Sequence, residues 1–339
     1  MRIERNYEKR DVRESFFPVA EVPLKYVLGD QEHDVKGYKG IVDVERRQVL
    51  STVSEHYTLV RNEDVYELMR PVAQVFFGGS GLDDFECLNI HMPQSRASCC
   101  IDLTRKNPES HLFKVCDGDP WTAFVRIANS YNRTSKLKIQ IGYCRWICQN
   151  GTIFGARSYS VAICHDVQDL ASPAFRESVI RGAIRAVGEA GGAEKEFASS
   201  LETLRALPMT EEETEMLFWR VFGFCSSPGG LGALPKKRRE RLLEIRQRVL
   251  WAMASYRQEF GGTAYAAFNV MTDFATYPDG KRSHAFLTPL RQAKVGDWLA
   301  SFVPAARKPD FSFYRYFTPA DTLPLTQFQN WEIHRVQGR

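Results

Sequence analysis

Apolar residues in the first half of the chain come in short alternating runs that are typical of β-strands. Residues 38–60 are rich in Val and Ile, and a charged cluster at 45–47 divides them into two expected strands. Residues 121–131 and 136–150 flank a turn-rich segment and form the clearest expected hairpin. Along its second strand the faces alternate, with Leu137, Ile139, Ile141 and Tyr143 on one and Lys136, Lys138 and Gln140 on the other. This pattern predicts a sheet with one packed face and one wetter, basic face.

Apolar residues in the second half recur at helical spacing instead. From about Ser172 the pattern predicts two helices, and Thr210 is placed to cap a third with an acidic first turn. Pro235 opens a long helix with an apolar stripe that runs to Phe260, and residues 263–277 predict the next helix. In the first half, a polar helix start at 61–64 precedes apolar residues from Val65 to Phe76 at the same spacing, and the glycines that follow should end that helix.

The order of these elements predicts the α+β class, with an antiparallel sheet and one helix in the N-terminal half and a helical C-terminal half. We expect four regions. They are a semi-ordered arm at 1–35, a strand-rich core at 36–170, a helical region at 171–300 and an aromatic tail at 301–339.

Composition narrows the class of protein. The 339 residues are 44% hydrophobic and 25% charged, which excludes a disordered or low-complexity chain. No apolar run is long enough to cross a bilayer, and the first residues are too charged for a secretory signal, so we expect a cytoplasmic protein without membrane contact. Eight cysteines lack any Cys-x-x-Cys pair, and we therefore expect buried apolar thiols rather than a metal site.

Cations and aromatic rings crowd the expected hairpin in a combination typical of single-strand binding. Cations neutralise phosphates, and aromatic faces stack on unpaired bases. The expected contact residues are Arg126, Tyr131, Arg133, Lys136, Lys138 and Arg145. A solvated sheet face with core aromatics behind it is the competing interpretation, and the residues alone leave both open.

The long helix opens with a second basic segment. Seven cations between residues 236 and 248 are accompanied only by Glu240 and Glu244. Lys237, Arg241 and Arg248 share a helical face, which predicts a phosphate-contacting surface, with a solvated charged face as the alternative. Cations oppose the helix dipole at this end, which favours a bound anion.

Two catalytic hypotheses stay open beside the binding hypothesis. A metal-dependent nuclease would need clustered carboxylates and imidazoles, and the candidates are Glu86, His91, Asp102, Asp117 and Asp119. A cysteine hydrolase would use Cys148 with His165 and Asn150. Neither spacing is diagnostic, so no catalytic residue, metal ligand or cofactor is assigned.

Three segments, read in order, resemble a known family. The first holds Val53, Ser54, Tyr57 and Val60, the second Asn129, Ser130, Arg145, Cys148 and Asn150, and the third Gly262, Thr263, Asn269 and Thr272. Together they resemble the phage/plasmid-like family of domain of unknown function 932, from about Gly40 to Pro278. The resemblance implies a mobile-element setting and supplies no activity. The order of elements is also similar to that of single-strand annealing recombinases.

These observations predict a mobile-element protein that binds single-stranded nucleic acid in recombination, annealing or DNA protection. Assembly into a homo-oligomer is a secondary hypothesis. The rival functions are the metal-dependent nuclease and a protein-binding module that antagonises a host factor.

Overall fold

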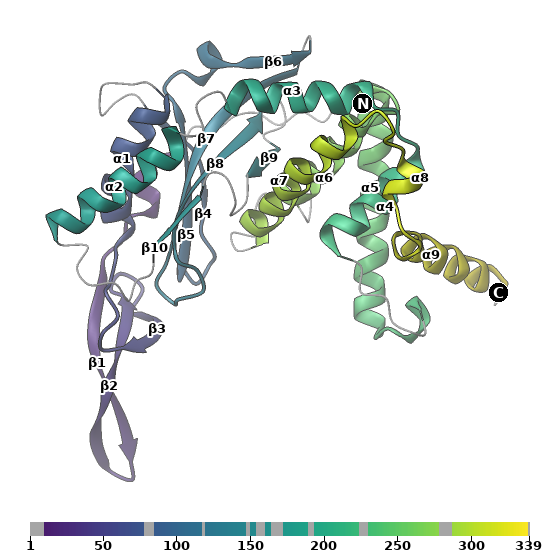
Figure 1. Cartoon of the computed structure of the whole chain (residues 1–339). Helices are drawn as coiled ribbons and strands as arrows, with labels where there is room; N and C mark the ends of the chain where they lie inside the picture. The colour runs from purple at the N-terminus through teal and green to yellow at the C-terminus, as the bar shows by residue number, and fades with distance from the viewer. Residues whose placement is uncertain are drawn as a thin grey trace.

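The computed structural model describes residues 10–77, 85–116, 119–146, 150–153, 160–163, 172–188, 193–223, 230–277 and 287–337. In this part of the chain antiparallel sheets fill the N-terminal half and helices fill the C-terminal half, so the predicted α+β class is confirmed (Figure 1).

A three-stranded antiparallel sheet forms from β1 (Val19–Leu28), β2 (Gln31–Asp43) and β3 (Gln48–Ser54). The turn expected at 45–47 joins β2 to β3 and is confirmed. The far ends of β1 and β2 extend as a two-stranded ribbon beyond β3 (Figure 1). β1 lies where the sequence predicts a semi-ordered arm. Its prolines hide the strand pattern, because Pro18 precedes the strand and Pro23 lies beside a register shift.

The larger sheet follows the order β10-β8-β7-β5-β4, with β6 also paired to β7 and β9 to β8. Its strands are β4 (Phe85–His91), β5 (Ser98–Arg105), β6 (Phe113–Cys116), β7 (Asp119–Ser130), β8 (Leu137–Arg145), β9 (Gly151–Ile153) and β10 (Ser160–Ile163). β7 and β8 form the predicted hairpin, with Val125 opposite Ile141.

Helices cover both sides of this sheet (Figure 1). Helix α1 (Asn62–Phe77) packs on β5 and β7 with α2 (Pro173–Gly188) beside it, while α6 (Ala264–Thr276) and α7 (Leu287–Ala306) pack on β9. The remaining helices are α3 (Ala193–Ala206), α4 (Glu211–Phe222), α5 (Lys236–Phe260), α8 (Phe313–Tyr316) and α9 (Pro319–Gln337). Short 3-10 turns lie at Val12–Ser15, Pro108–His111 and Leu231–Ala233. The expected cap of α4 is confirmed, since the hydroxyl of Thr210 accepts a hydrogen bond from the Glu213 amide at 3.1 Å.

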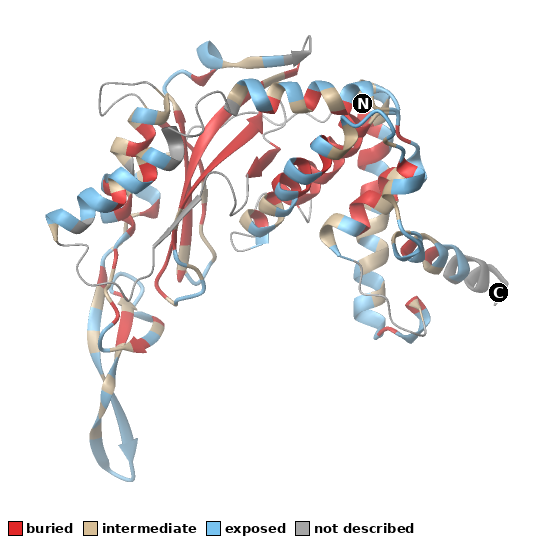
Figure 2. Ribbon diagram, viewed as in Figure 1, coloured by how far each residue is buried: buried red, intermediate tan, exposed pale blue. Residues whose placement is uncertain are grey.

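Burial differs from the expected pattern in the centre of the sheet. Leu137, Ile139 and Ile141 are buried as predicted, but Gln140 on the opposite face is buried as well. Figure 2 shows β7 and β8 as continuous buried strands between the helices. The wetter face is therefore restricted to the start of β8, because Gln292 of α7 lies on this face and binds Arg126, the register partner of Gln140.

The C-terminal region is helical where the sequence predicts an aromatic tail, since α9 forms despite Pro324 within it. Among the described helices, none combines the length and the apolar character that crossing a membrane requires.

Candidate nucleic-acid interface

Three loops meet where the two sheets join, and we call them together the basic loop cluster. They are the β2–β3 turn (44–47), the β4–β5 loop (93–97) and the β7–β8 turn (131–136). The Arg46 guanidinium donates to the Gln94 carbonyl at 2.7 Å, and the Tyr131 amide donates to the Ala97 carbonyl at 2.8 Å. The Ser51 hydroxyl of β3 donates to the Tyr131 carbonyl at 2.6 Å, which ties the third loop to the smaller sheet.

The basic loop cluster carries a strong excess of positive charge. Together with the adjoining strand residues Asp43 and Lys138, the three loops contain six cations, Arg46, Arg47, Arg96, Arg133, Lys136 and Lys138, against two carboxylates, Asp43 and Glu45. Both carboxylates are bound by Arg96, whose Nη1 lies 3.2 Å from Asp43 and 2.6 Å from Glu45. The formal net charge of these residues is therefore +4, six cations minus two carboxylates.

Each of the three loops holds an arginine in the left-handed backbone region. Among the described residues, four non-glycine residues have positive φ, and three of them are Arg47 (54°), Arg96 (55°) and Arg133 (59°). This conformation costs a residue with a Cβ about 1 kcal/mol or more, and glycine or asparagine would adopt it more easily.

Some of the hairpin residues predicted to contact nucleic acid are accessible in the structure, and others are buried. Arg133 and Lys136 are exposed and Lys138 is half-buried. Tyr131 is only 1% exposed, its hydroxyl accepts a hydrogen bond from the Asn62 amide at 3.1 Å, and burial raises its pKa. Its ring is therefore part of the packed interior and is not accessible for stacking on a base.

Arg126 is fully buried in a polar network on the covered face of the sheet. Its guanidinium donates to both oxygens of Asp102, at 2.5 and 2.6 Å, and to the side-chain oxygen Oε1 of Gln292 on α7 at 2.7 Å. The imidazole of His91 lies 3.1 Å from Arg126 and 3.3 Å from Asp102. Burial alone would raise the pKa of Asp102, but the guanidinium holds it well below its ordinary value. In this conformation Arg126 is satisfied by protein groups and cannot reach a phosphate.

Gln292 also closes the sheet from the helical side. Its amide nitrogen donates to the Thr276 hydroxyl at 3.1 Å, and its backbone carbonyl accepts from Thr152 of β9 at 3.4 Å. α7 therefore completes the hydrogen bonding of two strands that lie far from it in sequence.

Arg145 is buried in a second network and is likewise inaccessible. Its guanidinium pairs with Asp119, and its Nη2 lies 2.7 Å from Glu259 of α5. The Tyr265 hydroxyl donates to the same aspartate, and burial together with this carboxylate raises the Tyr265 pKa well above its ordinary value.

The basic segment of α5 is partly exposed. Lys237 is exposed, and Arg241 is exposed with Glu244 at 3.5 Å. Arg248 lies 3.8 Å from Asp273 and is largely covered. The predicted helical surface is thus present around Lys237 and Arg241 but does not extend to Arg248.

The catalytic alternatives gain no support from the described residues. Asp102 and Asp119 occupy separate networks with arginine partners, and no group of three metal-ligating side chains occurs in the described ranges. Asp117, Cys148 and His165 lie outside the described residues. Asn150 is buried and donates to the Tyr256 hydroxyl at 2.7 Å. Four cysteines, Cys87, Cys99, Cys100 and Cys144, are buried free thiols, as expected.

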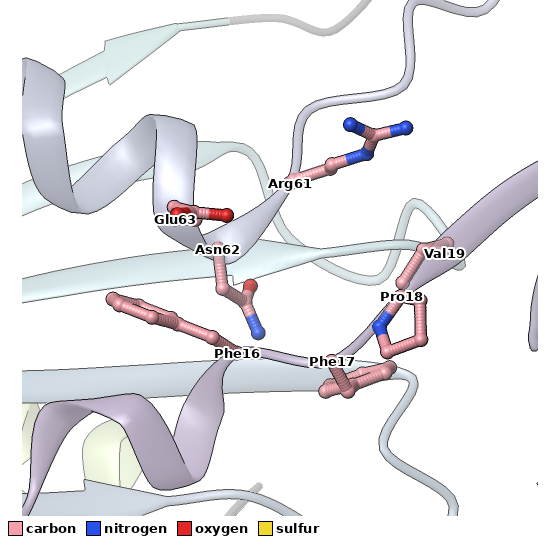
Figure 3. A pocket seen from close by; sticks show the side chains of 7 residues that line it. All are labelled: Phe16, Phe17, Pro18, Val19, Arg61, Asn62 and Glu63. Atoms are coloured by element: carbon pink, nitrogen blue, oxygen red, sulfur yellow. The ribbon is translucent and has the colours of Figure 1, made fainter. Parts of the chain in front are cut away.

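A pocket of about 400 Å³ lies beside the basic loop cluster. It is lined by Phe16, Phe17, Pro18, Val19, Arg61, Asn62 and Glu63 (Figure 3). Phe17 links the pocket to the cluster, because its ring centre lies 5.8 Å from that of Tyr131 and 4.8 Å from the Arg96 guanidinium.

Sequence reasoning missed Phe16, Phe17, Arg46, Arg47 and Arg61. Arg46 and Arg47 were visible as a charged turn, but nothing local signals that this turn binds the β4–β5 loop, which in turn binds the β7–β8 turn. The two phenylalanines precede a proline in a charged segment and show no periodic pattern.

A family model described as Domain of unknown function (DUF932) matches residues 49–285, which is more than half of the chain. The comparisons with curated proteins and with solved structures find no match.

Proposed function

The chain belongs to the family described as domain of unknown function DUF932, and we propose that it binds single-stranded nucleic acid through the basic loop cluster. The proposed setting is cytoplasmic, in recombination, annealing or protection of mobile-element DNA. A homo-oligomer stays a prediction, which light scattering on the purified protein would test.

The left-handed arginines carry the proposal. Arg47 and Arg133 are exposed, belong to different loops, and occupy backbone conformations that favour glycine. Strained backbone of this kind concentrates at binding and catalytic sites, where the function of the side chain offsets the loss of stability. Together with Arg46 and Lys136 they give four exposed cations at one end of the sheet, as backbone phosphates require.

Single strands fit this surface better than a duplex. The cluster is built from three short loops and does not present a helix or ribbon of regular length to a groove. Aromatic rings that are not fully buried, Phe16 and Phe17, lie next to the cations, and base–aromatic stacking requires unpaired bases.

Replacing the strained arginines with glycine separates binding from folding. We expect the double variant Arg47→Gly/Arg133→Gly to keep its melting temperature within about 2 °C, because relief of the left-handed strain offsets the entropy that glycine adds to the unfolded chain. Its affinity for labelled oligo-dT, measured by fluorescence anisotropy at low salt, should fall at least about tenfold. The slope of log K against log salt should become less negative by about 1.4, or 0.7 for each lost phosphate contact.

Two matched controls isolate the cause. Asn107→Gly makes the same backbone change at φ 52° outside the basic loop cluster and should leave affinity unchanged. Lys106→Ala/Lys308→Ala removes the same charge from exposed positions elsewhere and should reduce affinity much less. Absence of salt-dependent binding by the wild-type protein, or equal losses in the second control, would reject the proposed function. A further variant, Lys237→Glu/Arg241→Glu, measures any contribution from α5.

A further inference from the structure

We infer that the pocket beside the basic loop cluster accepts one unpaired base and prefers a base with an exocyclic amino group over thymine or uracil. The inference rests on the proposed function, because the strand must first be held by the cations of the cluster. Its volume of about 400 Å³ lies within the range of small-molecule pockets.

The pocket has rigid aromatic walls. The Phe17 ring is held by the Arg96 guanidinium and by Tyr131, and the Phe16 ring centre lies 5.8 Å from that of Tyr66 on α1. Both phenylalanines keep part of their surface exposed although they pack against core groups. Fixed aromatic surface next to cations provides stacking for a base at little cost in side-chain entropy.

The floor of the pocket is already formed. Asn62 is 2% exposed, its amide nitrogen donates to the Ser15 carbonyl at 2.9 Å, and its carbonyl accepts from Asn129 at 2.9 Å. Figure 3 shows the Asn62 side chain reaching down between the rings of Phe16 and Phe17. Because its polar groups are used by the protein, this residue shapes the floor and leaves recognition to the rim.

The rim residues Arg61 and Glu63 give the pocket its selectivity. Both are exposed, and neither forms an ion pair within the described part of the chain. An ionised carboxylate only accepts hydrogen bonds, so Glu63 can bind the amino group of cytosine, adenine or guanine. Thymine and uracil lack this group and present a carbonyl oxygen there, which a carboxylate repels. Arg61 is placed to bind the phosphate of the same nucleotide.

The shared path between the pocket and the basic loop cluster supports this reading. Tyr131 begins the β7–β8 turn and contacts Phe17, while its hydroxyl binds the Asn62 amide. Arg96 contacts Phe17 and also holds the β2–β3 turn through Glu45. A strand bound to the cluster therefore passes directly beside the pocket.

The test measures anisotropy with labelled oligo-dC and oligo-dT of roughly 12 nucleotides, within the usual range of single-strand site sizes. The wild-type protein should bind oligo-dC more tightly than oligo-dT by about two- to tenfold, which is the effect of one hydrogen bond. In Glu63→Gln this preference should fall to near unity, because a carboxamide also donates to thymine. The ratio of the two affinities is insensitive to the general gain that follows from removing a negative charge.

Glu67→Gln is the matched control, since it removes a carboxylate from the same helix outside the pocket and should keep the preference. Phe17→Ala should weaken both probes by about five- to a hundredfold, as expected for a lost stacking contact, and its melting temperature shows whether it folds. Equal binding of both probes by the wild type, or an unchanged preference in Glu63→Gln, would overturn the pocket while leaving the proposed function standing. Failure of both probes to bind would instead reject the proposed function itself.

Discussion

Substitution of Arg126 distinguishes a structural role of this residue from a role in nucleic-acid binding. Replacing it with methionine leaves Asp102, which is 1% exposed, as a buried carboxylate without its cation. Breaking one side of a buried ion pair costs about 3–5 kcal/mol. A chain of 339 residues unfolds with an entropy of about 0.7 kcal/mol/K near its melting temperature, so we expect Arg126→Met to melt about 4–7 °C lower than the wild type.

The size of this loss should depend on pH. In the wild type the pKa of Asp102 is depressed, so the stability that this group contributes is present above about pH 4 and is lost as the pH falls below it. In Arg126→Met, burial without the guanidinium should raise the pKa of Asp102 instead, and stability should then be lost as the pH rises above about 4. The difference in melting temperature should therefore be largest near neutral pH and should shrink toward about pH 4.

Thermal unfolding monitored by circular dichroism at several pH values provides the assay. The double variant Asp102→Leu/Arg126→Met should recover most of the loss, because apolar replacement of a complete buried pair is often neutral or stabilising. Below its melting temperature, Arg126→Met should bind oligo-dT within about twofold of the wild type. A variant that melts normally but loses binding would refute the buried structural role and return Arg126 to the nucleic-acid interface.

Two further predictions test the packing of the sheet. Gly142→Ala would place a Cβ against the Phe124 ring and 2.7 Å from the Thr152 carbonyl, so soluble yield and melting temperature should fall sharply, whereas Gly232→Ala, with open space around it, should not reduce them. Burial raises the pKa of Cys87 to about 12 and of Cys100 to about 11. Mass spectrometry should therefore find both thiols unlabelled by iodoacetamide in the native protein near pH 8 and labelled in denaturant; rapid native labelling would contradict the packing.

Local sequence patterns predicted the helices and strands well where apolar side chains recur with a single period along the segment. The hairpin strand at 137–145 and the cap at Thr210 depend on neighbours within a few residues, and both are confirmed, although the alternation of buried and wetter positions holds only for the start of that strand. The strand β1 escaped prediction because Pro18 precedes it, Pro23 lies beside a register shift, and its distal half is a ribbon with mostly exposed side chains.

The candidate site was predicted only in part, because burial depends on distant segments. In the sequence Arg126 alternates with apolar residues, as an exposed cation on a half-buried strand would. The residue that binds it, Gln292, follows 166 positions later, so no local pattern shows that Arg126 is buried. Arg133 and Lys136 stay accessible and lie in the turn between β7 and β8. The β4–β5 loop links this turn to the β2–β3 turn through hydrogen bonds between loops, which have no sequence signature.

The bond between Arg126 and Gln292 also has a consequence for synthesis of the chain. At about 5–20 residues per second, a ribosome needs roughly 8–33 s to add the 166 residues between them. During that interval the strands of the sheet can pair. The face that α7 will cover is still open to water, and it carries Arg126, Gln140 and Thr152, which are buried in the finished fold. The N-terminal half is therefore synthesised well before the helix that packs on it. Until α7 is made, this face of the sheet stays uncovered, and it is the face of the growing chain that most needs protection from wrong contacts.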